Sequence, residues 1–153
     1  MISESQSLEV SALLEGYSAR QFTPGDVIAG VMDRIAKQPD YNSWITLLSP
    51  QQLQAYIRVL DDTSPEALPL YGIPFAIKDN IDLVGVPTTA GCPEYAYLPE
   101  QSAFVVQCLI DAGAIPIGKT NLDQFATGLV GTRSPYGAGK NSFDPDYISG
   151  GSS

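Results

Sequence analysis

Residues 72–80 read Gly72-Ile73-Pro74-Phe75-Ala76-Ile77-Lys78-Asp79-Asn80, an apolar run that ends in three polar side chains. The run before Lys78 is short and rich in β-branched and aromatic residues, which predicts a strand that ends at this lysine. A helical pattern and a second apolar run at residues 114–117 follow it along the chain. The order strand, helix, strand is typical of an α/β protein.

The first 70 residues are predicted to be mainly helical. One apolar stripe has side chains three and four residues apart: Val10, Leu13, Leu14 and Tyr17. We expect this helix to break at Gly16 and again at residues 21–23. Two later helix starts place a capping residue before a proline, in Thr23-Pro24-Gly25-Asp26 and in Ser49-Pro50-Gln51-Gln52. A short strand is expected at residues 44–48, and residues 61–69 are the candidate linker.

The pattern changes after the lysine strand. Ser102 is expected to cap a helix that Gly113 ends. The buried face of that helix is expected to hold Phe104, Val105, Cys108, Leu109 and Ala112. Asn121 is expected to cap a short helix that runs to Phe125. Residues 128–153 are rich in glycine, serine and proline, so they form either a disordered segment or an ordered functional loop.

Composition excludes several classes of function. The chain has 153 residues, no histidine, 8 Lys and Arg residues, and 17 Asp and Glu residues. The missing histidine excludes Ser-His-Asp and Cys-His nucleophile pairs, so proton transfer near neutral pH must use a carboxylate, a lysine, a tyrosine or a thiol. The net charge of −9 argues against binding to nucleic acid or to an anionic membrane.

Two further features concern the environment of the chain. Cys92 and Cys108 form no CxxC pair, which favours two buried free thiols in a reducing compartment. No signal peptide and no run long enough to cross a bilayer are visible, so we predict a cytoplasmic protein. The 44% hydrophobic content, beside only 16% charged residues, indicates much buried surface, either within the chain or against a partner.

Residues 113–120 match the phosphate-loop pattern G-x-x-x-x-G-K-[ST]. That site needs a strand before the first glycine, a helix after the last residue, and backbone N–H groups between them. Here a helix precedes Gly113, and Pro116 has no N–H to donate. We therefore interpret Gly113 as the end of a helix and Lys119 as a lysine at a strand end, with nucleotide binding as a minor alternative.

Two other segments can carry chemistry. Lys78 is either a solvent-exposed lysine beside Asp79 or a buried lysine that acts as a base in a chain without histidine. Ser149-Gly150-Gly151-Ser152-Ser153 is either a flexible tail or a glycine loop that brings serine hydroxyls close to a substrate. A serine hydroxyl is a weak nucleophile until a base activates it, and Lys78 is the natural partner.

The same segments resemble the amidase signature family. Residues 72–80 are similar to its lysine strand, residues 118–126 (Gly118-Lys119-Thr120-Asn121-Leu122-Asp123-Gln124-Phe125-Ala126) to its next block, and Gly150-Gly151-Ser152-Ser153 to the start of its glycine/serine signature. The resemblance implies an α/β fold with a mixed sheet flanked by helices. It also implies that residues 1–153 are the N-terminal part of one amidase domain, with a helical outer part at 1–70 and the start of the catalytic core at 71–153.

The resemblance also implies a Ser–cis-Ser–Lys triad. Lys78 is then the general base, and Ser152 is the bridging serine that passes a proton between the nucleophile and the lysine. In the family the acylated serine lies further along the chain than Ser153, so we expect this chain to be inactive alone. No metal and no organic cofactor are implied.

Residues 120–137 are most similar to the allophanate hydrolases of this family, which implies hydrolysis of allophanate with release of ammonia. Gly128 is the expected point where substrate approaches the backbone, and Arg133 is the candidate for binding the substrate carboxylate; an exposed loop arginine is the alternative. A glutamyl-tRNA amidotransferase A-like amidase and a non-catalytic binding module remain alternatives for the whole. The expected partners are a small amide and either the rest of the domain or a second copy of the chain.

Overall fold

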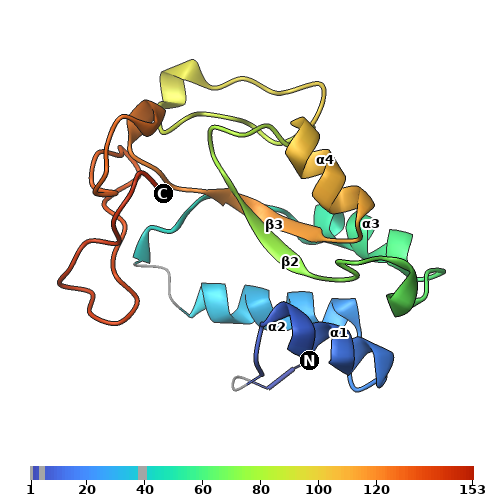
Figure 1. Cartoon of the computed structure of the whole chain (residues 1–153). Helices are drawn as coiled ribbons and strands as arrows, with labels where there is room; N and C mark the ends of the chain where they lie inside the picture. Colours follow the sequence, from blue (N-terminus) through green and yellow to red (C-terminus); the bar gives the residue numbers. More distant parts are fainter. Residues whose placement is uncertain (1, 4–5, 38–40) are drawn as a thin grey trace. The chain divides into compact units, whose positions relative to one another are not determined.

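The computed structural model describes residues 2–3, 6–37 and 41–153. Its helices and strands, in chain order, are α1 (Val10–Ser18), α2 (Pro24–Ala36), β1 (Trp44–Leu47), α3 (Pro50–Leu60), β2 (Pro74–Lys78), α4 (Phe104–Asp111) and β3 (Ile115–Thr120), as Figure 1 shows. The described residues also include short 3-10 turns at η2 (Pro65–Ala67), η3 (Pro93–Tyr95) and η4 (Gln124–Ala126). The α/β class predicted from the sequence is confirmed.

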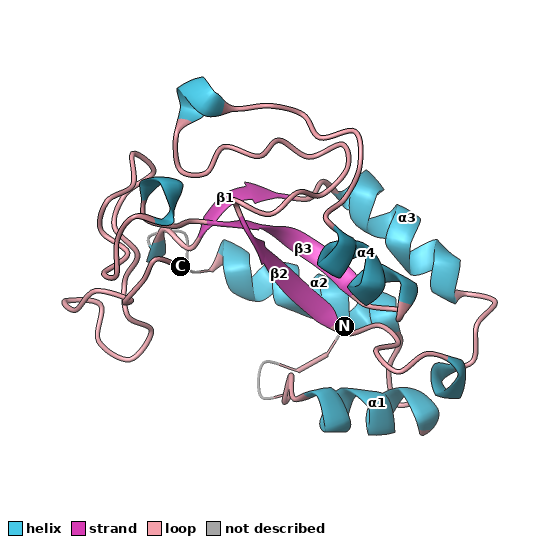
Figure 2. Ribbon diagram, turned by 45° about the horizontal axis from the view of Figure 1, so that its top comes forward, coloured by secondary structure: helices cyan, strands magenta, loops and turns pink. Residues whose placement is uncertain are grey.

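The three strands form one mixed sheet in the order β1-β3-β2. β1 runs antiparallel to β3, with Leu47 opposite Gly118. β2 and β3 lie side by side in both views, and the backbone hydrogen bonds Ile115 N to Ile73 O and Asp79 N to Thr120 O show that they run parallel (Figures 1 and 2). The end of β2 carries Lys78, as the sequence predicts.

The chain divides into two compact units. The first comprises the described residues before 38, with residues 48–75 and 107–117; the second comprises residues 41–47, 76–106 and 118–153. The predicted organisation into an outer part at 1–70 and the start of a catalytic core at 71–153 stays a prediction. The candidate linker at 61–69 lies inside the first unit and contains η2, so it does not separate two parts.

Helix starts in the first unit follow the predicted capping chemistry. Thr23 Oγ1 accepts a hydrogen bond from Asp26 N, and the Asp26 carboxylate accepts one from Thr23 N. Ser49 and Gln52 form the same reciprocal pair at the start of α3. Each pair satisfies N–H groups that the first turn of a helix leaves without a partner. Both predicted starts are therefore confirmed.

The end of α1 differs from the prediction. The helix continues through Gly16 to Ser18, and the Phe22 ring packs against Gly16. The ring fills the space that a side chain would take, so this glycine serves packing and does not end the helix. Tyr17, next to it, is buried and donates its hydroxyl to Gly72 O at 2.8 Å. The first unit thus uses local aromatic packing that the periodicity does not reveal.

The predicted buried face of α4 is wrong. Phe104 is 86% exposed and Val105 is 56% exposed, while Val106 is the residue of α4 that is buried. Ser102 does not cap the helix; its Oγ accepts a hydrogen bond from Val84 N at 3.1 Å. Consecutive apolar residues at the start of α4 fit more than one helical face, so periodicity could not choose between them. Gly113, with φ of +96°, follows the helix as predicted.

The predicted burial of both thiols is also wrong. Cys92 is half-buried and Cys108 is exposed, and both are free. Asn121 likewise does not cap the following turn, because η4 begins at Gln124 after Asp123. Its side-chain amide instead donates to Asn42 O and to Gly137 O, each at 2.9 Å. Asn121 therefore ties the loop after β3 to the segment before β1. Backbone hydrogen bonds also connect parts of residues 128–153, including Gly139 N to Gly131 O at 2.9 Å and Ser149 N to Gly139 O at 3.1 Å, which favours the functional-loop alternative.

Candidate active site

The structure brings Lys78 and Ser152 together. Lys78 Nζ donates a hydrogen bond to Ser152 Oγ, although the two residues are 74 positions apart in the sequence. Both side chains are half-buried and both belong to the second unit. The contact gives the lysine at the end of β2 a hydroxyl partner, which is the arrangement that a lysine base requires.

The backbone around Ser152 is held from one side by Asp123. The Gly151–Ser152 peptide bond is cis. Asp123 N donates to Ser152 O at 2.6 Å. The neighbouring Ser153 turns elsewhere: its Oγ donates to Asn121 O at 2.6 Å and lies 2.9 Å from Thr120 Oγ1. The two adjacent serines therefore have different partners, and only the first meets Lys78.

The Asp123 carboxylate is fully buried and is held by backbone donors. It accepts hydrogen bonds from Arg133 N at 2.8 Å, Gly131 N at 3.0 Å and Val130 N at 3.1 Å. The hydrogen bond from Arg133 N, together with those from Gly131 and Val130, holds the pKa of Asp123 below its usual range, against the effect of burial. Asp123 thus fixes the 130–133 loop through its side chain and Ser152 through its backbone.

Gly128 and Arg133, the predicted substrate-binding residues, both lie next to Asp123. A Cβ at Gly128 would stand 2.2 Å from Asp123 Oδ2, so the chain's own carboxylate already occupies the space beside this glycine. Arg133 contacts Asp123 through its backbone N–H, and its side chain is exposed. Neither position shows a contact that assigns it to a substrate, so both roles remain predictions.

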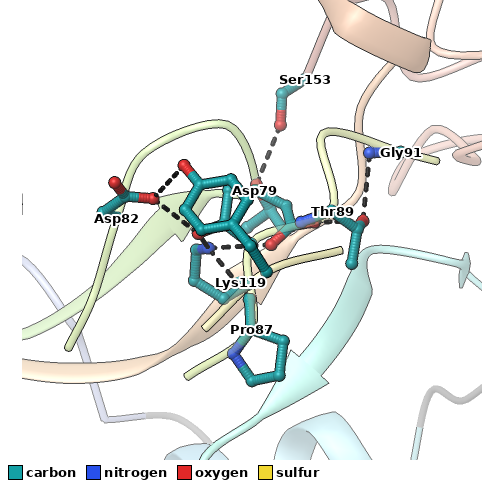
Figure 3. Close-up of polar contacts among 10 residues, drawn as sticks. Asp79, Asp82, Pro87, Thr89, Gly91, Lys119 and Ser153 are labelled. Carbon is teal, nitrogen blue, oxygen red and sulfur yellow. Dashed lines mark hydrogen bonds and ion pairs between the residues drawn. The ribbon is translucent and has the colours of Figure 1, made fainter. Parts of the chain in front are cut away.

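Lys119 is a buried residue of this region that the sequence argument missed. Its side chain is fully buried, and its Nζ forms an ion pair with Asp79 Oδ1 at 2.8 Å and donates to Thr88 Oγ1 at 3.0 Å (Figure 3). Lys119 lies inside β3, and no α-helix follows Thr120 in the described residues 121–153. The phosphate-loop alternative is therefore wrong. Lys119 does lie at a strand end, as predicted, since β3 ends at Thr120, but its burial was not predicted.

Polar contacts continue from Lys119 toward the surface. Thr88 Oγ1 donates to Asp82 Oδ1 at 2.8 Å, and the exposed Tyr97 donates its hydroxyl to the same oxygen at 2.8 Å (Figure 3). The hydrogen bond to Asp82, with smaller effects of burial and of the Asp82 charge, raises the pKa of Tyr97 to about 12. A continuous hydrogen-bonded chain thus joins the buried lysine to a surface tyrosine.

A cavity of about 200 Å³ lies beside the two serines. Its lining includes Ser152, Ser153, Thr120, Asn121 and the exposed Lys140.

Among the described residues, no three acidic or cysteine side chains are grouped so that they could hold a metal ion. Within the same described ranges, no helix is both long and apolar enough to cross a membrane.

A family profile matches most of the chain. The profile of the amidase family covers residues 26–153, and the chain therefore belongs to the amidase family. Its relatives include urea amidolyase of Saccharomyces cerevisiae, which is 51% identical over 128 residues, or 83% of this chain. A glutamyl-tRNA(Gln) amidotransferase subunit of Lawsonia intracellularis is 40% identical over 138 residues, or 88% of this chain.

Solved structures show the same fold. An allophanate hydrolase of Kluyveromyces lactis superposes on 99% of this chain with a TM-score of 0.85 and 45% identity. The predicted family and the likeness to allophanate hydrolase are thus confirmed. The chain spans only a part of these proteins: 7% of the yeast urea amidolyase, 25% of the allophanate hydrolase chain and 28% of the amidotransferase subunit.

Proposed function

We propose that Lys78 and Ser152 are two members of a Ser–cis-Ser–Lys triad that hydrolyses a small amide. The contact between Lys78 Nζ and Ser152 Oγ carries this proposal. From the family resemblance we expect the third member, the acylated serine, further along the amidase domain than residue 153. The reaction is therefore proposed for the domain that contains this segment.

In this mechanism the neutral Lys78 amine accepts the proton of the Ser152 hydroxyl. Ser152 Oγ takes the proton of the nucleophilic serine, whose oxygen then bonds to the amide carbonyl carbon. The proton returns through Ser152 to the leaving nitrogen as the carbon–nitrogen bond breaks. Water then hydrolyses the acyl-enzyme by the same proton route. This route is compatible with a chain that has no histidine, because every proton transfer uses an amine or a hydroxyl.

Allophanate is the substrate that we propose, with ammonia as a product. The support is the 45% identity to the allophanate hydrolase of K. lactis and the 51% identity to the urea amidolyase of S. cerevisiae. Allophanate carries a carboxylate, and Arg133 remains the proposed cation for it because its side chain is exposed on the loop that Asp123 holds.

A chimeric enzyme tests this function. Residues 1–153 would replace the matching quarter of the K. lactis allophanate hydrolase, and ammonia release from allophanate would be measured. We expect activity in the chimera and a loss of at least about a hundredfold in kcat for Lys78→Ala and for Ser152→Ala, the usual size of a proton-transfer effect. Lys37→Ala, at a lysine of a surface ion pair with Asp33, is the matched control and should leave kcat unchanged. Full activity of the Lys78→Ala chimera would refute the proposed role.

The amidotransferase relatives support a second candidate. Because the chain is 40% identical to the L. intracellularis amidotransferase subunit, the alternative is an amidase of that type, for which we propose glutamine as the amide substrate. Glutamine offered to the same chimera would separate the two, because an allophanate enzyme should release no ammonia from it. A chimera that is folded but inactive on both amides, with the parent enzyme active, would favour a non-catalytic binding module.

A further inference from the structure

Lys119 is a fully buried cation that the proposed proton route does not use. Its side chain and that of Asp79, the residue after β2, are both 0% exposed, with 2.8 Å between Nζ and Oδ1 (Figure 3). Thr88 Oγ1 accepts a second hydrogen bond from the same ammonium at 3.0 Å. Buried ion pairs contribute little net stability, because the loss of water around both charges offsets their attraction. The pair therefore invites a role other than stability.

Asp79 is the residue next to Lys78, and it is held on every polar atom. Its backbone N–H donates to Thr120 O at 3.2 Å, and its backbone carbonyl accepts from Ala90 N at 2.9 Å. Its Oδ2 accepts from Thr89 N at 2.9 Å and from the Thr89 hydroxyl, while its Oδ1 accepts from Lys119. Lys78 is the last residue of β2, and Asp79 begins the turn after it. The two adjacent side chains have different partners, because Lys78 meets Ser152 while Asp79 meets Thr89 and Lys119. The fixed Asp79 therefore anchors the end of the strand from which Lys78 extends.

The end of β3 reaches both halves of the Lys78–Ser152 pair. Lys119 binds Asp79, which is the neighbour of Lys78. The next residue of β3 is Thr120, and its Oγ1 lies 2.9 Å from the Oγ of Ser153, the neighbour of Ser152. Two consecutive residues of one strand thus connect to the chain on each side of the contact. Successive residues of a strand have a fixed spacing. Lys119 and Thr120 therefore set the distance between the segment that carries Lys78 and the segment that carries Ser152.

We propose that Lys119 is a positioning residue that holds Lys78 against Ser152 through Asp79. Lys119 touches neither the reacting hydroxyl nor, by this proposal, the substrate. Its ammonium fixes the Asp79 carboxylate, and Asp79 fixes the backbone from which Lys78 extends. The catalytic meaning of this arrangement rests on the proposed function of Lys78 and Ser152, whereas the positioning itself does not.

Competitive acylation of lysines in the 153-residue chain measures the positioning directly. A small amount of acetic anhydride is added to the folded chain, and mass spectrometry compares acetylation of Lys78 with that of the exposed Lys140. We expect Lys119→Met to raise acetylation of Lys78, relative to Lys140, by about tenfold, the factor for loss of one hydrogen bond by a charged donor. Ser152→Ala should produce a similar rise, because it removes the partner itself. Unchanged acetylation of Lys78 in folded Lys119→Met would overturn the proposal.

The double variant Lys119→Met/Ser152→Ala shows whether Lys119 acts through the contact. If it does, acetylation in the double variant equals that of Ser152→Ala alone, because the contact can be lost only once. A further tenfold rise would mean that Lys119 shields Lys78 by another route, and the proposal would fail. Turnover of the chimera is a separate readout: inactivity there refutes the proposed function and leaves this measurement intact.

Removal of one partner of a buried pair can unfold a chain, so a second variant is included. Asp79→Asn/Lys119→Met buries no unpaired charge and keeps an oxygen for Thr89 N. It should show the same rise at Lys78, and an unchanged value would overturn the proposal. In the native chain, the amide hydrogens of Asp79 and Ala90 should exchange with solvent only on global unfolding. Exchange as fast as in an exposed loop would contradict the anchoring role of the pair.

Discussion

Asp79 and Asp123 are both fully buried carboxylates of the second unit, yet they are held in different ways. Asp79 stands beside Lys78, and its ionic partner is one side chain, Lys119. Asp123 binds the backbone of Ser152, and its carboxylate is held by three backbone N–H groups. Each carboxylate thus supports one half of the Lys78–Ser152 pair.

The difference predicts how each half responds to change. A single substitution can remove the ammonium that neutralises Asp79, and a charge is then left buried without a partner. No single side-chain substitution removes the donors of Asp123, because they belong to the backbone. The lysine half is therefore sensitive to the identity of one residue, while the serine half is sensitive to the shape of a loop and to protonation.

The largest effect is expected for Asp79→Asn. It leaves the Lys119 ammonium buried without its anion, which should lower the free energy of unfolding by about 3–5 kcal/mol. Urea unfolding followed by circular dichroism measures the change. Asp33→Asn is the matched control, because Asp33 pairs with Lys37 at 2.9 Å on the surface, and such pairs contribute about 0–1 kcal/mol. Equal losses in the two variants would show that burial of the Asp79–Lys119 pair has no special weight.

Gly128→Ala tests the loop shape on the serine side. A Cβ there would meet Asp123 Oδ2 at 2.2 Å, so the carboxylate or the loop must move, at a cost of about 1–3 kcal/mol. Gly25→Ala in the first turn of α2 is the control, because its Cβ would have its nearest contact at 3.7 Å. The same urea experiment compares them. A neutral Gly128→Ala would show that Asp123 is free to shift and does not hold the loop rigidly.

Acid sensitivity tests the contribution of Asp123 to the serine side. The pKa of Asp123 is lowered in the folded chain, first by Arg133 N and then by the other backbone donors. The unfolded chain therefore binds more protons in the acidic range, and the stability from Asp123 is present above the ordinary aspartate pKa of about 3.9 and is lost as the pH falls through the folded value. The urea midpoint of unfolding is measured from neutral pH down to below the ordinary aspartate pKa. With falling pH, this midpoint should decrease less steeply for Asp123→Asn than for the native chain. Parallel curves would refute this linkage.

Local chemistry makes part of the fold predictable. The capping residues Thr23 and Ser49 mark helix starts by contacts within three residues, so the sequence alone indicates them. The strand before Lys78 is predictable in the same way. The buried face of α4 is not, because Phe104, Val105 and Val106 are all apolar and only the tertiary fold selects Val106 for burial.

The candidate site shows the same division. Lys78 and Ser152 could be named from the missing histidine, a strand end and a glycine/serine segment, supported by a family resemblance. Lys119 could not, because its partner Asp79 lies 40 residues earlier and the letters around Lys119 match a phosphate loop. The role of Asp123 is not predictable from the sequence either, because its carboxylate binds backbone N–H groups, which every residue except proline carries.

The smallest effect is expected at Tyr97, the surface end of the chain that begins at Lys119. Tyr97 is 42% exposed, so Tyr97→Phe should cost about 0.5 kcal/mol, the low end for a hydrogen bond. The pKa of Tyr97 is raised to about 12, first by its hydrogen bond to Asp82. The contribution of this hydrogen bond to stability is therefore fully present below about pH 10, the ordinary tyrosine pKa, and is lost as the pH rises through the folded pKa.

Alkaline titration of tyrosine absorbance should therefore show a late phase that Tyr97→Phe reduces but does not remove, because burial also raises the pKa values of Tyr17, Tyr56 and Tyr71. Tyr147, which is 68% exposed, gives the matched control in Tyr147→Phe, and that variant should leave the late phase in place. A loss of stability in Tyr97→Phe as large as that in Asp79→Asn would show that the hydrogen bonds through Thr88 and Asp82 act as one unit. The lysine side of the site would then depend on the surface as well as on its buried pair.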